Sequence, residues 1–307
     1  MHLDVARELE PVVADALNTH YRLADIDWDP AAYVPWDEGV DFVERPWEPY
    51  QSSFSPEVRA ALHMALATED DLPAYRSSID AHFGPDGPWG EWVRRWTAEE
   101  TRHSRSLWAF LCATRGADPA LMQSDTMATI QAGYRDDRKS ILDVCVYVTV
   151  QELATRESHA RTGRAAGDTD KMALRLLKRI SLDENRHMLF YRRLVDAALE
   201  IDPSAALTAI SREIRTFSMP GEHTVPAYRR RAALIARAQI YNIHIHHQRV
   251  IKPLVSHWRV FERTGLDAPA EVERELLAGY LTLLDQAAAR EQEVIERANA
   301  RRKALAC

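Results

Sequence analysis

Apolar residues recur every three or four positions along most of this 307-residue chain, which is the spacing of one helix face. From Ser55 the pattern runs through Leu62 and Leu66 toward Phe83, and Ser55 followed by Pro56 is typical of a helix start. Three more apolar stripes predict helices over residues 88–115, 139–164 and 169–201. We therefore expect four long helices that pack by their apolar faces.

The segments on either side of these stripes predict an arm and further helices. Residues 1–54 are rich in Pro, Trp and Asp, which indicates an ordered arm with one short helix near residues 10–21. After Asp202 and Pro203, helical patterns return near residues 203–217, 226–262 and 269–300. We expect one all-α domain that consists of the arm (1–54), a four-helix bundle (55–202) and additional helices (203–307).

Composition narrows the class of protein. No run of 18 apolar residues and no basic leader before an apolar stretch occurs, so we expect no membrane span and a place in the cytoplasm. Three cysteines, Cys112, Cys145 and Cys307, have the spacing of neither a disulfide framework nor a zinc site. They are expected to be core or terminal thiols.

Charge is unevenly distributed. The net charge is −7, but residues 1–60 hold 13 acidic and 4 basic side chains, whereas residues 205–263 hold 10 basic and 3 acidic ones. A basic segment on an acidic protein, with Arg229, Arg230 and Arg231 in it, is a candidate docking surface for an acidic protein partner. Solvated helix faces are an equal alternative, and we expect no nucleic acid partner.

The candidate chemistry is a short pattern that occurs twice. Glu100 and His103 stand three residues apart in WTAEETRHS, and Glu184 and His187 do so in SLDENRHML. Residues three apart share one face of a helix. Both pairs interrupt apolar stripes, where ionisable groups are costly to bury unless they are paired or bind a cation. A bound metal is the simplest compensation.

Single glutamates in the two other bundle helices complete a ligand set. Glu69 continues the stripe of Leu62 and Leu66, and Glu152 follows Cys145 and Val148 on one face. Two Glu-x-x-His pairs with one glutamate from each of two further helices are typical of a carboxylate-bridged di-iron centre. Carboxylate and imidazole donors suit iron or manganese better than zinc or calcium. The predicted metal ligands are Glu69, Glu100, His103, Glu152, Glu184 and His187.

Two local features carry weaker expectations. Pro73 cannot donate a hydrogen bond to the Glu69 carbonyl, so it predicts either a helix kink at that ligand or a helix boundary. The histidines of YNIHIHHQRV, His244, His246 and His247, have a poor spacing for convergence on a helix, which favours structural roles over a second metal site.

Five segments together resemble a known family. They are TEDDLPAY (68–75), RWTAEETRHS (95–104), VQELATRESHARTG (150–163), DENRHMLFYRRL (183–194) and FSMPG (217–221). The resemblance is to the soluble acyl-acyl carrier protein desaturases, especially their actinobacterial and mycobacterial branch. It implies a homodimeric, ferritin-like bundle with two iron ions. It also implies that oxygen and two electrons, from a ferredoxin-type donor, insert a cis double bond into an acyl chain on acyl carrier protein.

The resemblance also implies roles for individual residues. Glu100 and Glu184 would bridge the irons, and Thr155 would lie beside the oxygen site, where its hydroxyl can relay protons. Trp96 and Asp183 match positions of an electron path and of a histidine-orienting carboxylate. The alternatives are an ordinary helix threonine and a plain core tryptophan.

The reaction itself sets one further requirement. An unactivated methylene offers no acidic proton, so a cofactor must carry the difficult step, and an apolar channel beside the metals must fix the reacting carbons. We expect part of its wall near Ser78, Ala81 and His82.

A metal site does not by itself choose the reaction, so other classes stay open. One is another di-iron oxidase or oxygenase that acts on a carrier-bound substrate. A second is a radical protein like a ribonucleotide reductase small subunit, for which Tyr147 and Tyr191 are available. A third is an iron-binding protein without a channel.

Overall fold

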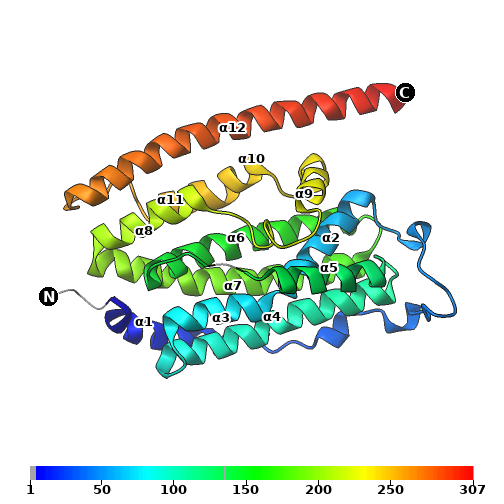
Figure 1. Ribbon diagram of the computed structural model, residues 1–307, viewed down its shortest axis with the longest axis horizontal. Coiled ribbons are helices and arrows are strands. Elements are labelled where there is room, and N and C mark those ends of the chain that lie inside the picture. Colours follow the sequence, from blue (N-terminus) through cyan, green and yellow to red (C-terminus); the bar gives the residue numbers. More distant parts are fainter. Residues whose placement is uncertain (1–4, 135, 307) are drawn as a thin grey trace.

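The computed structural model describes residues 5–134 and 136–306, and all the regular structure within these ranges is helical (Figure 1). The predicted all-α class is confirmed. The bundle is built from α2 (Pro56–Glu69) with α3 (Leu72–Phe83), α4 (Gly87–Ala113), α6 (Ile141–Ala166) and α7 (Lys171–Ile201). Of these, α6 and α7 pack most extensively against each other.

The first bundle helix differs from the prediction of one continuous helix. The Ser55 hydroxyl accepts a hydrogen bond from the Val58 amide at 3.2 Å and starts α2, as the sequence indicated. The helix ends at Glu69, and Pro73 lies in the first turn of α3, where its missing N–H has no carbonyl to serve. Pro73 therefore marks a boundary and not a kink, and Glu69 is the last residue of its helix.

Two other predictions needed correction. The helix α5 (Pro119–Ala132) was not predicted, because its apolar residues are spread around the helix and form no stripe. The stretch 226–262 is not one helix. It is divided into α9 (Tyr228–Arg237), α10 (Ile243–His246), a π-helical turn (His247–Ile251) and α11 (Lys252–His257). The break before α10 follows Gln239 at φ 56°, and the Asn242 side chain then caps α10.

The N-terminal arm runs along the outside of the bundle. It starts with α1 (Val5–His20), which packs on α4 and α7, and continues through 3₁₀ turns at Pro30–Tyr33, Trp36–Glu38 and Pro49–Gln51. The blue segments of Figure 1 show this path beside α3, α4 and α7. Two arm side chains, His20 and Trp28, are buried and reach into the bundle.

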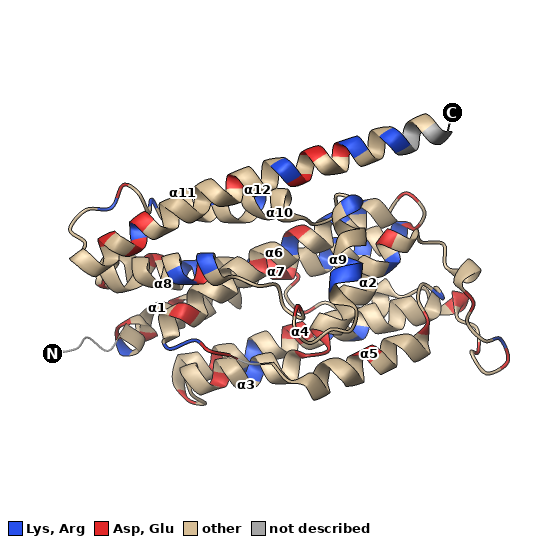
Figure 2. Cartoon of the chain, turned by 45° about the horizontal axis from the view of Figure 1, so that its top comes forward, with Lys and Arg blue, Asp and Glu red and all other residues tan. Residues whose placement is uncertain are grey.

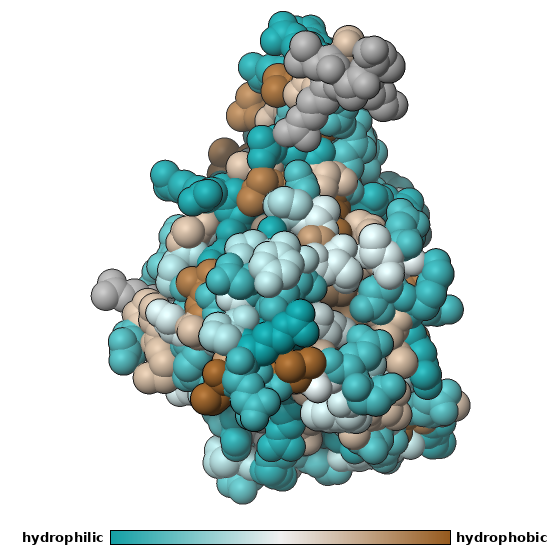
Figure 3. Space-filling view, turned by 90° about the vertical axis from the view of Figure 1, so that its right-hand side faces the viewer, coloured by the Kyte–Doolittle hydropathy of each residue, from teal (hydrophilic) through white to brown (hydrophobic). Residues whose placement is uncertain are grey.

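The C-terminal helices form a second layer on the bundle. α8 (Pro203–Thr216) packs on α6 and on the first half of α12 (Ala268–Ala306), whose later turns extend away from the body (Figure 1). Viewed along the bundle, the turns of α12 before residue 302 project from a mostly hydrophilic surface (Figure 3). Val272, Leu283 and Val294 on α12 are each more than half exposed.

The apolar core has two parts, one on each side of a buried polar layer in the middle of the bundle. On α4, Trp92 and Trp96 belong to one part, and Leu107 and Leu111 belong to the other. On α7 the same division falls between Ile180 and Met188. The polar residues of α4 and α7 between these limits are therefore surrounded by apolar packing on both sides.

No helix in the described ranges is long and apolar enough to cross a bilayer. Cys145 is buried and Cys112 is half-buried, and both are free thiols. Cys307 lies outside the described residues.

Candidate metal centre

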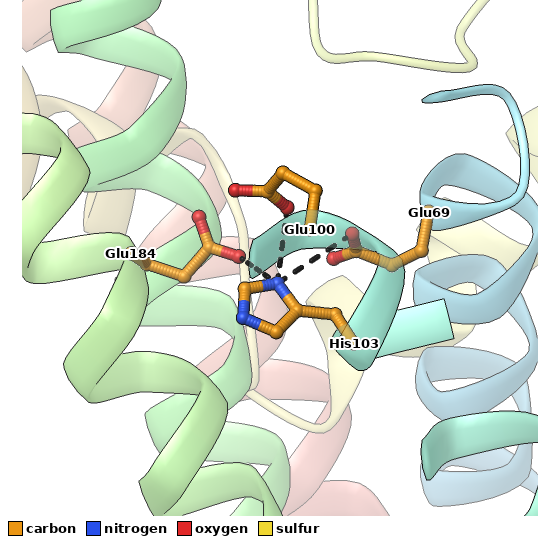
Figure 4. A group of neighbouring side chains, drawn as sticks. All are labelled: Glu69, Glu100, His103 and Glu184. Atoms are coloured by element: carbon orange, nitrogen blue, oxygen red, sulfur yellow. Dashed lines mark hydrogen bonds and ion pairs between the residues drawn. The ribbon is translucent and has the colours of Figure 1, made fainter. Parts of the chain in front are cut away.

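The six predicted ligand residues come together between the two parts of the core. Glu69 ends α2, Glu100 and His103 lie on α4, Glu152 on α6, and Glu184 and His187 on α7. Five of them are buried, and Glu69 is nearly so, with 10 % of its side chain exposed. Figure 4 shows the carboxylates of Glu69, Glu100 and Glu184, from three helices, turned toward the imidazole of His103.

The donor atoms form two overlapping groups. One consists of Glu69, Glu100, His103 and Glu184, and the other of Glu100, Glu152, Glu184 and His187. Within each group the donor atoms all lie within 4.8 Å of one another. Glu100 and Glu184 belong to both groups, so the geometry provides two adjacent cation positions that share two carboxylates.

Both imidazoles direct the same nitrogen at this cluster. Nδ1 of His103 lies 3.0 Å from Glu100 Oε2, 3.5 Å from Glu184 Oε1 and 3.8 Å from Glu69 Oε2. Nδ1 of His187 lies 2.7 Å from Glu100 Oε1 and 3.6 Å from Glu152 Oε2. In each ring Nε2 is therefore left to face other protein groups.

Unpaired buried atoms indicate that the cluster fits metal ions. Glu100 Oε1, Glu152 Oε2 and His187 Nδ1 are buried and make no hydrogen bond of good geometry, although Glu100 Oε1 and His187 Nδ1 lie 2.7 Å apart. Such atoms are costly in a protein interior, and a coordinated cation would satisfy all of them. A set of carboxylate oxygens and imidazole nitrogens suits iron or manganese.

The charges of the cluster are strongly coupled. Burial raises the pKa of Glu152 well above its usual value, and the Glu184 and Glu100 carboxylates raise it further. Burial alone would lower the pKa of His187, but the carboxylates of Glu100, Glu152 and Glu99 together more than offset this and raise it well above the usual value. Metal binding to this cluster would therefore compete with protons for the same donor atoms.

The three residues that the resemblance placed beside the ligands do lie near them. The Thr155 hydroxyl donates to Glu184 Oε2 at 2.6 Å, and the Trp96 indole donates to Glu152 Oε1 at 3.0 Å. Asp183 Oδ2 lies 3.6 Å from Nε2 of His103. The Trp28 indole of the arm donates to Asp183 at 2.5 Å.

Several residues of the site were missed by the sequence reasoning. Glu99 Oε2 lies 2.8 Å from Nε2 of His187, and His20 Nε2 lies 3.0 Å from Glu99 Oε1. His159 lies 3.3 Å from Glu69. A longer repeat could have identified Glu99, because residues 95–103 and 179–187 both read Arg-x-x-x-(Glu or Asp)-Glu-x-Arg-His.

A cavity of about 640 Å³, including open solvent, adjoins the cluster. Glu69, Glu100 and Glu184 form part of its wall. Ser78 lines it as predicted, whereas Ala81 and His82 are not among its lining residues. Apolar side chains make up much of the remaining wall, and they include Leu72, Ile79, Val144 and Val148.

The cavity also has a polar wall that the sequence did not indicate. Ser78 and Arg138 both donate hydrogen bonds to the carboxylate of Asp136. Arg138 also donates to Glu213 at 3.0 Å and to the Tyr134 hydroxyl at 2.8 Å. Acyl methylenes would gain no apolar contact from these charged groups.

Two of the histidines of residues 244–247 have different protein neighbours. His246 Nδ1 lies 2.8 Å from the Tyr241 hydroxyl, and His247 Nδ1 lies 3.4 Å from Asp285 Oδ1. The two imidazoles therefore face different partners.

Comparison with known proteins identifies relatives over most of the chain. A family model described as fatty acid desaturase matches residues 1–306. The acyl-ACP (acyl carrier protein) desaturase DesA1, as it is named in Mycobacterium tuberculosis, is 38 % identical over 287 residues, which are 90 % of this chain and 84 % of that protein. A chloroplastic stearoyl-ACP 9-desaturase 6 of Arabidopsis thaliana is 27 % identical over 99 % of this chain and 80 % of its own length.

A solved structure has the same fold. The X-ray structure of the protein named as acyl-ACP desaturase DesA2 of Mycobacterium tuberculosis H37Rv matches with a TM-score of 0.71 and 25 % identity. The match covers 88 % of this chain and 98 % of that one. Most of this chain thus has an architecture that also occurs in a protein named as a desaturase.

Removing one carboxylate from the cluster should have opposite effects on the stability of the metal-free protein and on metal binding. In Glu152→Gln, an uncharged amide replaces a carboxyl that burial and two neighbouring carboxylates disfavour, so the metal-free protein should unfold at the same or a higher temperature. The rise in unfolding temperature on adding Fe²⁺ without oxygen should shrink, because a ligand is lost. Scanning calorimetry with and without metal measures both.

Glu157→Gln is the matched control, since Glu157 is buried on the same helix but pairs with Arg156 at 2.8 Å. It should keep the full metal-induced rise. An equal rise in Glu152→Gln and in the wild-type protein would remove Glu152 from the ligand set.

Proposed function

Because this chain belongs to the fatty acid desaturase family, we propose that it introduces a cis double bond into an acyl chain carried on acyl carrier protein, in an oxygen-dependent reaction. The observation that carries the proposal is the pair of donor groups that share Glu100 and Glu184 beside a cavity with apolar walls. The cavity distinguishes this reading from an iron-binding protein without catalysis, which would need no such space.

The cofactor in this proposal is a pair of iron ions. Glu69 and His103 would hold one ion, Glu152 and His187 the other, and Glu100 and Glu184 both. When bound, the two ions supply the oxygen activation that breaks two unactivated C–H bonds, which no side chain can do. Loss of two hydrogens from adjacent carbons, with two electrons and two protons from outside, reduces one oxygen molecule to two water molecules.

The protein's own residues would position the acyl chain and the metal ligands and exclude bulk water. The cavity holds the acyl chain beside the cluster, so that the same carbon pair always lies within reach. Trp96 fixes Glu152 through its indole hydrogen bond, and the Thr155 hydroxyl, which lines the cavity and bonds Glu184, can hold or move a proton there. The apolar packing on both sides keeps bulk water from the cluster.

Acyl carrier protein would dock on the basic surface around α9. Arg229 and Arg230 are exposed, whereas Arg231 is bonded to Asp125 and to the Pro226 carbonyl. Figure 2 shows the basic colour on α9 beside α2. The loop that leads into α9 contains Pro220, which lines the cavity, so this loop connects the basic surface with the substrate space along the chain.

Other predictions belong to the same proposal. A ferredoxin-type donor would deliver the electrons, and the homodimer and the cytoplasmic location stay predictions. A radical protein of the ribonucleotide reductase type is the second candidate, since the Tyr191 hydroxyl is buried without a hydrogen-bond partner. The comparisons favour the desaturase, because the relatives in them are named as desaturases.

The direct test supplies the iron-loaded protein with saturated acyl-ACP thioesters of several lengths, a reduced ferredoxin system and oxygen. Mass spectrometry should find products 2 Da lighter, with one double bond at a fixed position, because two hydrogens are lost. A metal-free sample is the control. If every thioester stays saturated while the loaded protein consumes oxygen, an oxidase without acyl substrate is the better description.

Reversing the charge at the docking surface should impair carrier recognition. Arg229→Glu combined with Arg230→Glu should raise KM for acyl-ACP by about tenfold or more and leave kcat nearly unchanged, because steering charges act before chemistry. Arg259→Glu, an equally exposed arginine between α11 and α12, is the control. A changed kcat with an unchanged KM would place the docking surface elsewhere.

The wall at Ser78 should limit acyl length. Ser78→Leu fills space at the wall where the Ser78 side chain bonds Asp136; if acyl chains extend to this wall, activity on the longest accepted acyl chain should fall by roughly tenfold relative to the shortest. Ser78→Ala removes the hydroxyl without filling the space and should keep the length profile. An unchanged profile in Ser78→Leu, measured with a thioester series, would mean that acyl chains do not reach this wall.

A further inference from the structure

A short segment that occurs in both α4 and α7 contributes to the two proposed metal positions. In each copy, one acidic residue faces the histidine of the other helix. Residues 95–103 of α4 and 179–187 of α7 carry the same pattern. The acid just before each shared glutamate reaches the histidine of the opposite helix: Glu99 of α4 bonds His187 of α7, and Asp183 of α7 faces His103 of α4. The segments are thus related by an approximate twofold exchange.

The arm supplies a different partner to each acid. His20 Nε2 lies 3.0 and 3.1 Å from the two carboxylate oxygens of Glu99, whereas the Trp28 indole donates to Asp183. His20 and Glu99 are almost fully buried, and the His20 ring packs edge-on against Trp92. The arm therefore provides a hydrogen-bond partner to both acids, an imidazole to Glu99 and an indole to Asp183.

The contacts to the two ligand histidines are unequal. Glu99 lies 2.8 Å from Nε2 of His187, within hydrogen-bond distance, whereas Asp183 lies 3.6 Å from Nε2 of His103. A carboxylate bonded to the outer nitrogen of a ligand histidine fixes the tautomer and ring orientation and strengthens the inner nitrogen as a donor. Only the Glu99 contact has the length to do this.

We infer that His20 and Glu99 are positioning residues for His187, and that through them the N-terminal arm controls one of the two metal positions. The inference rests on the two-metal centre proposed above. Glu99 holds the imidazole with Nδ1 toward Glu100 and Glu152, and His20, with Arg95, holds Glu99. The position formed with His103 does not depend on this pair.

Arg95 and Arg102 strengthen the connection between arm and site. Arg95 bonds both Glu99 and Asp27, and Arg102 donates to the Ile26 carbonyl at 2.8 Å. Arg186, in the α7 copy of the repeated segment, donates to the carbonyls of Ala24 and Asp25. Arm residues 20–28 are thereby fastened to both copies of the repeat. Binding that depends on the arm must in turn stabilise the arm, since such coupling is reciprocal.

The test is a titration of the metal-free full chain with Co²⁺ alone, followed by visible absorption and by metal analysis, with no substrate present. The wild-type protein should bind two ions per chain. Glu99→Gln should weaken one of them by about 10- to 100-fold and leave the other unchanged. His20→Phe, which keeps a ring against Trp92 but removes the hydrogen bond, should weaken the same ion by a smaller factor.

Combined variants identify the affected position. Glu99→Gln added to His187→Ala should cause no further loss, because both act on one position, whereas Glu99→Gln added to His103→Ala should weaken both ions. His63→Phe is the matched control, since His63 is a buried imidazole that bonds Asp125 at 2.8 Å outside the centre. It should lower the unfolding temperature and keep both ions.

Three outcomes would overturn the inference. Two ions bound as tightly in Glu99→Gln and His20→Phe as in the wild-type protein would leave the proposed function intact and remove the positioning role. Equal weakening of both ions in these variants, or in His63→Phe, would reduce the effect to general destabilisation. Fewer than two ions in the wild-type protein would overturn the inference together with the two-metal centre on which the proposed function rests.

Discussion

The whole structure depends on placing four carboxylates and two imidazoles in the middle of an apolar bundle. Unpaired charges there would cost several kcal/mol each. The protein balances them by mutual contact, as in the Glu100 carboxylate that approaches both His103 and His187. Atoms such as Glu152 Oε2, which lack a hydrogen-bond partner, are those that a cation at the proposed centre would satisfy. The division of the apolar core into two parts follows from this central polar layer.

Support for the centre comes from outside the bundle. The arm and two buried acids, Glu99 and Asp183, form a layer behind the ligand histidines, and arginines tie that layer to arm carbonyls. Long helices alone would leave the imidazoles free to rotate. The surrounding contacts restrict them, which is how outer groups tune metal sites in general. Because His20 and Trp28 differ chemically, the two otherwise similar halves of the centre are not equivalent.

The break between α2 and α3 connects the centre to the substrate space. Glu69 ends α2, and the chain then turns into α3, whose Leu72 and Ile79 line the cavity. One helix end therefore supplies a ligand while the next helix supplies an apolar wall. At another wall of the same cavity, Asp136 and Arg138 present charged groups in place of apolar ones. An acyl chain would therefore be restricted by the polarity of this wall as well as by the size of the cavity.

The sequence by itself determined the helical class, the three later bundle helices to within about two residues, and the residues that meet at the centre. These follow from local rules, because residues three apart share a helix face and apolar stripes must face one another. The tertiary structure alone decided what no local rule contains. It decided that Trp28 reaches Asp183, that Glu99 and His20 stand behind His187, and that Ser78 meets Asp136 at a cavity wall. Each of these contacts joins residues from different elements, often far apart in the chain, and such proximity depends on how the helices pack rather than on the period within any one of them.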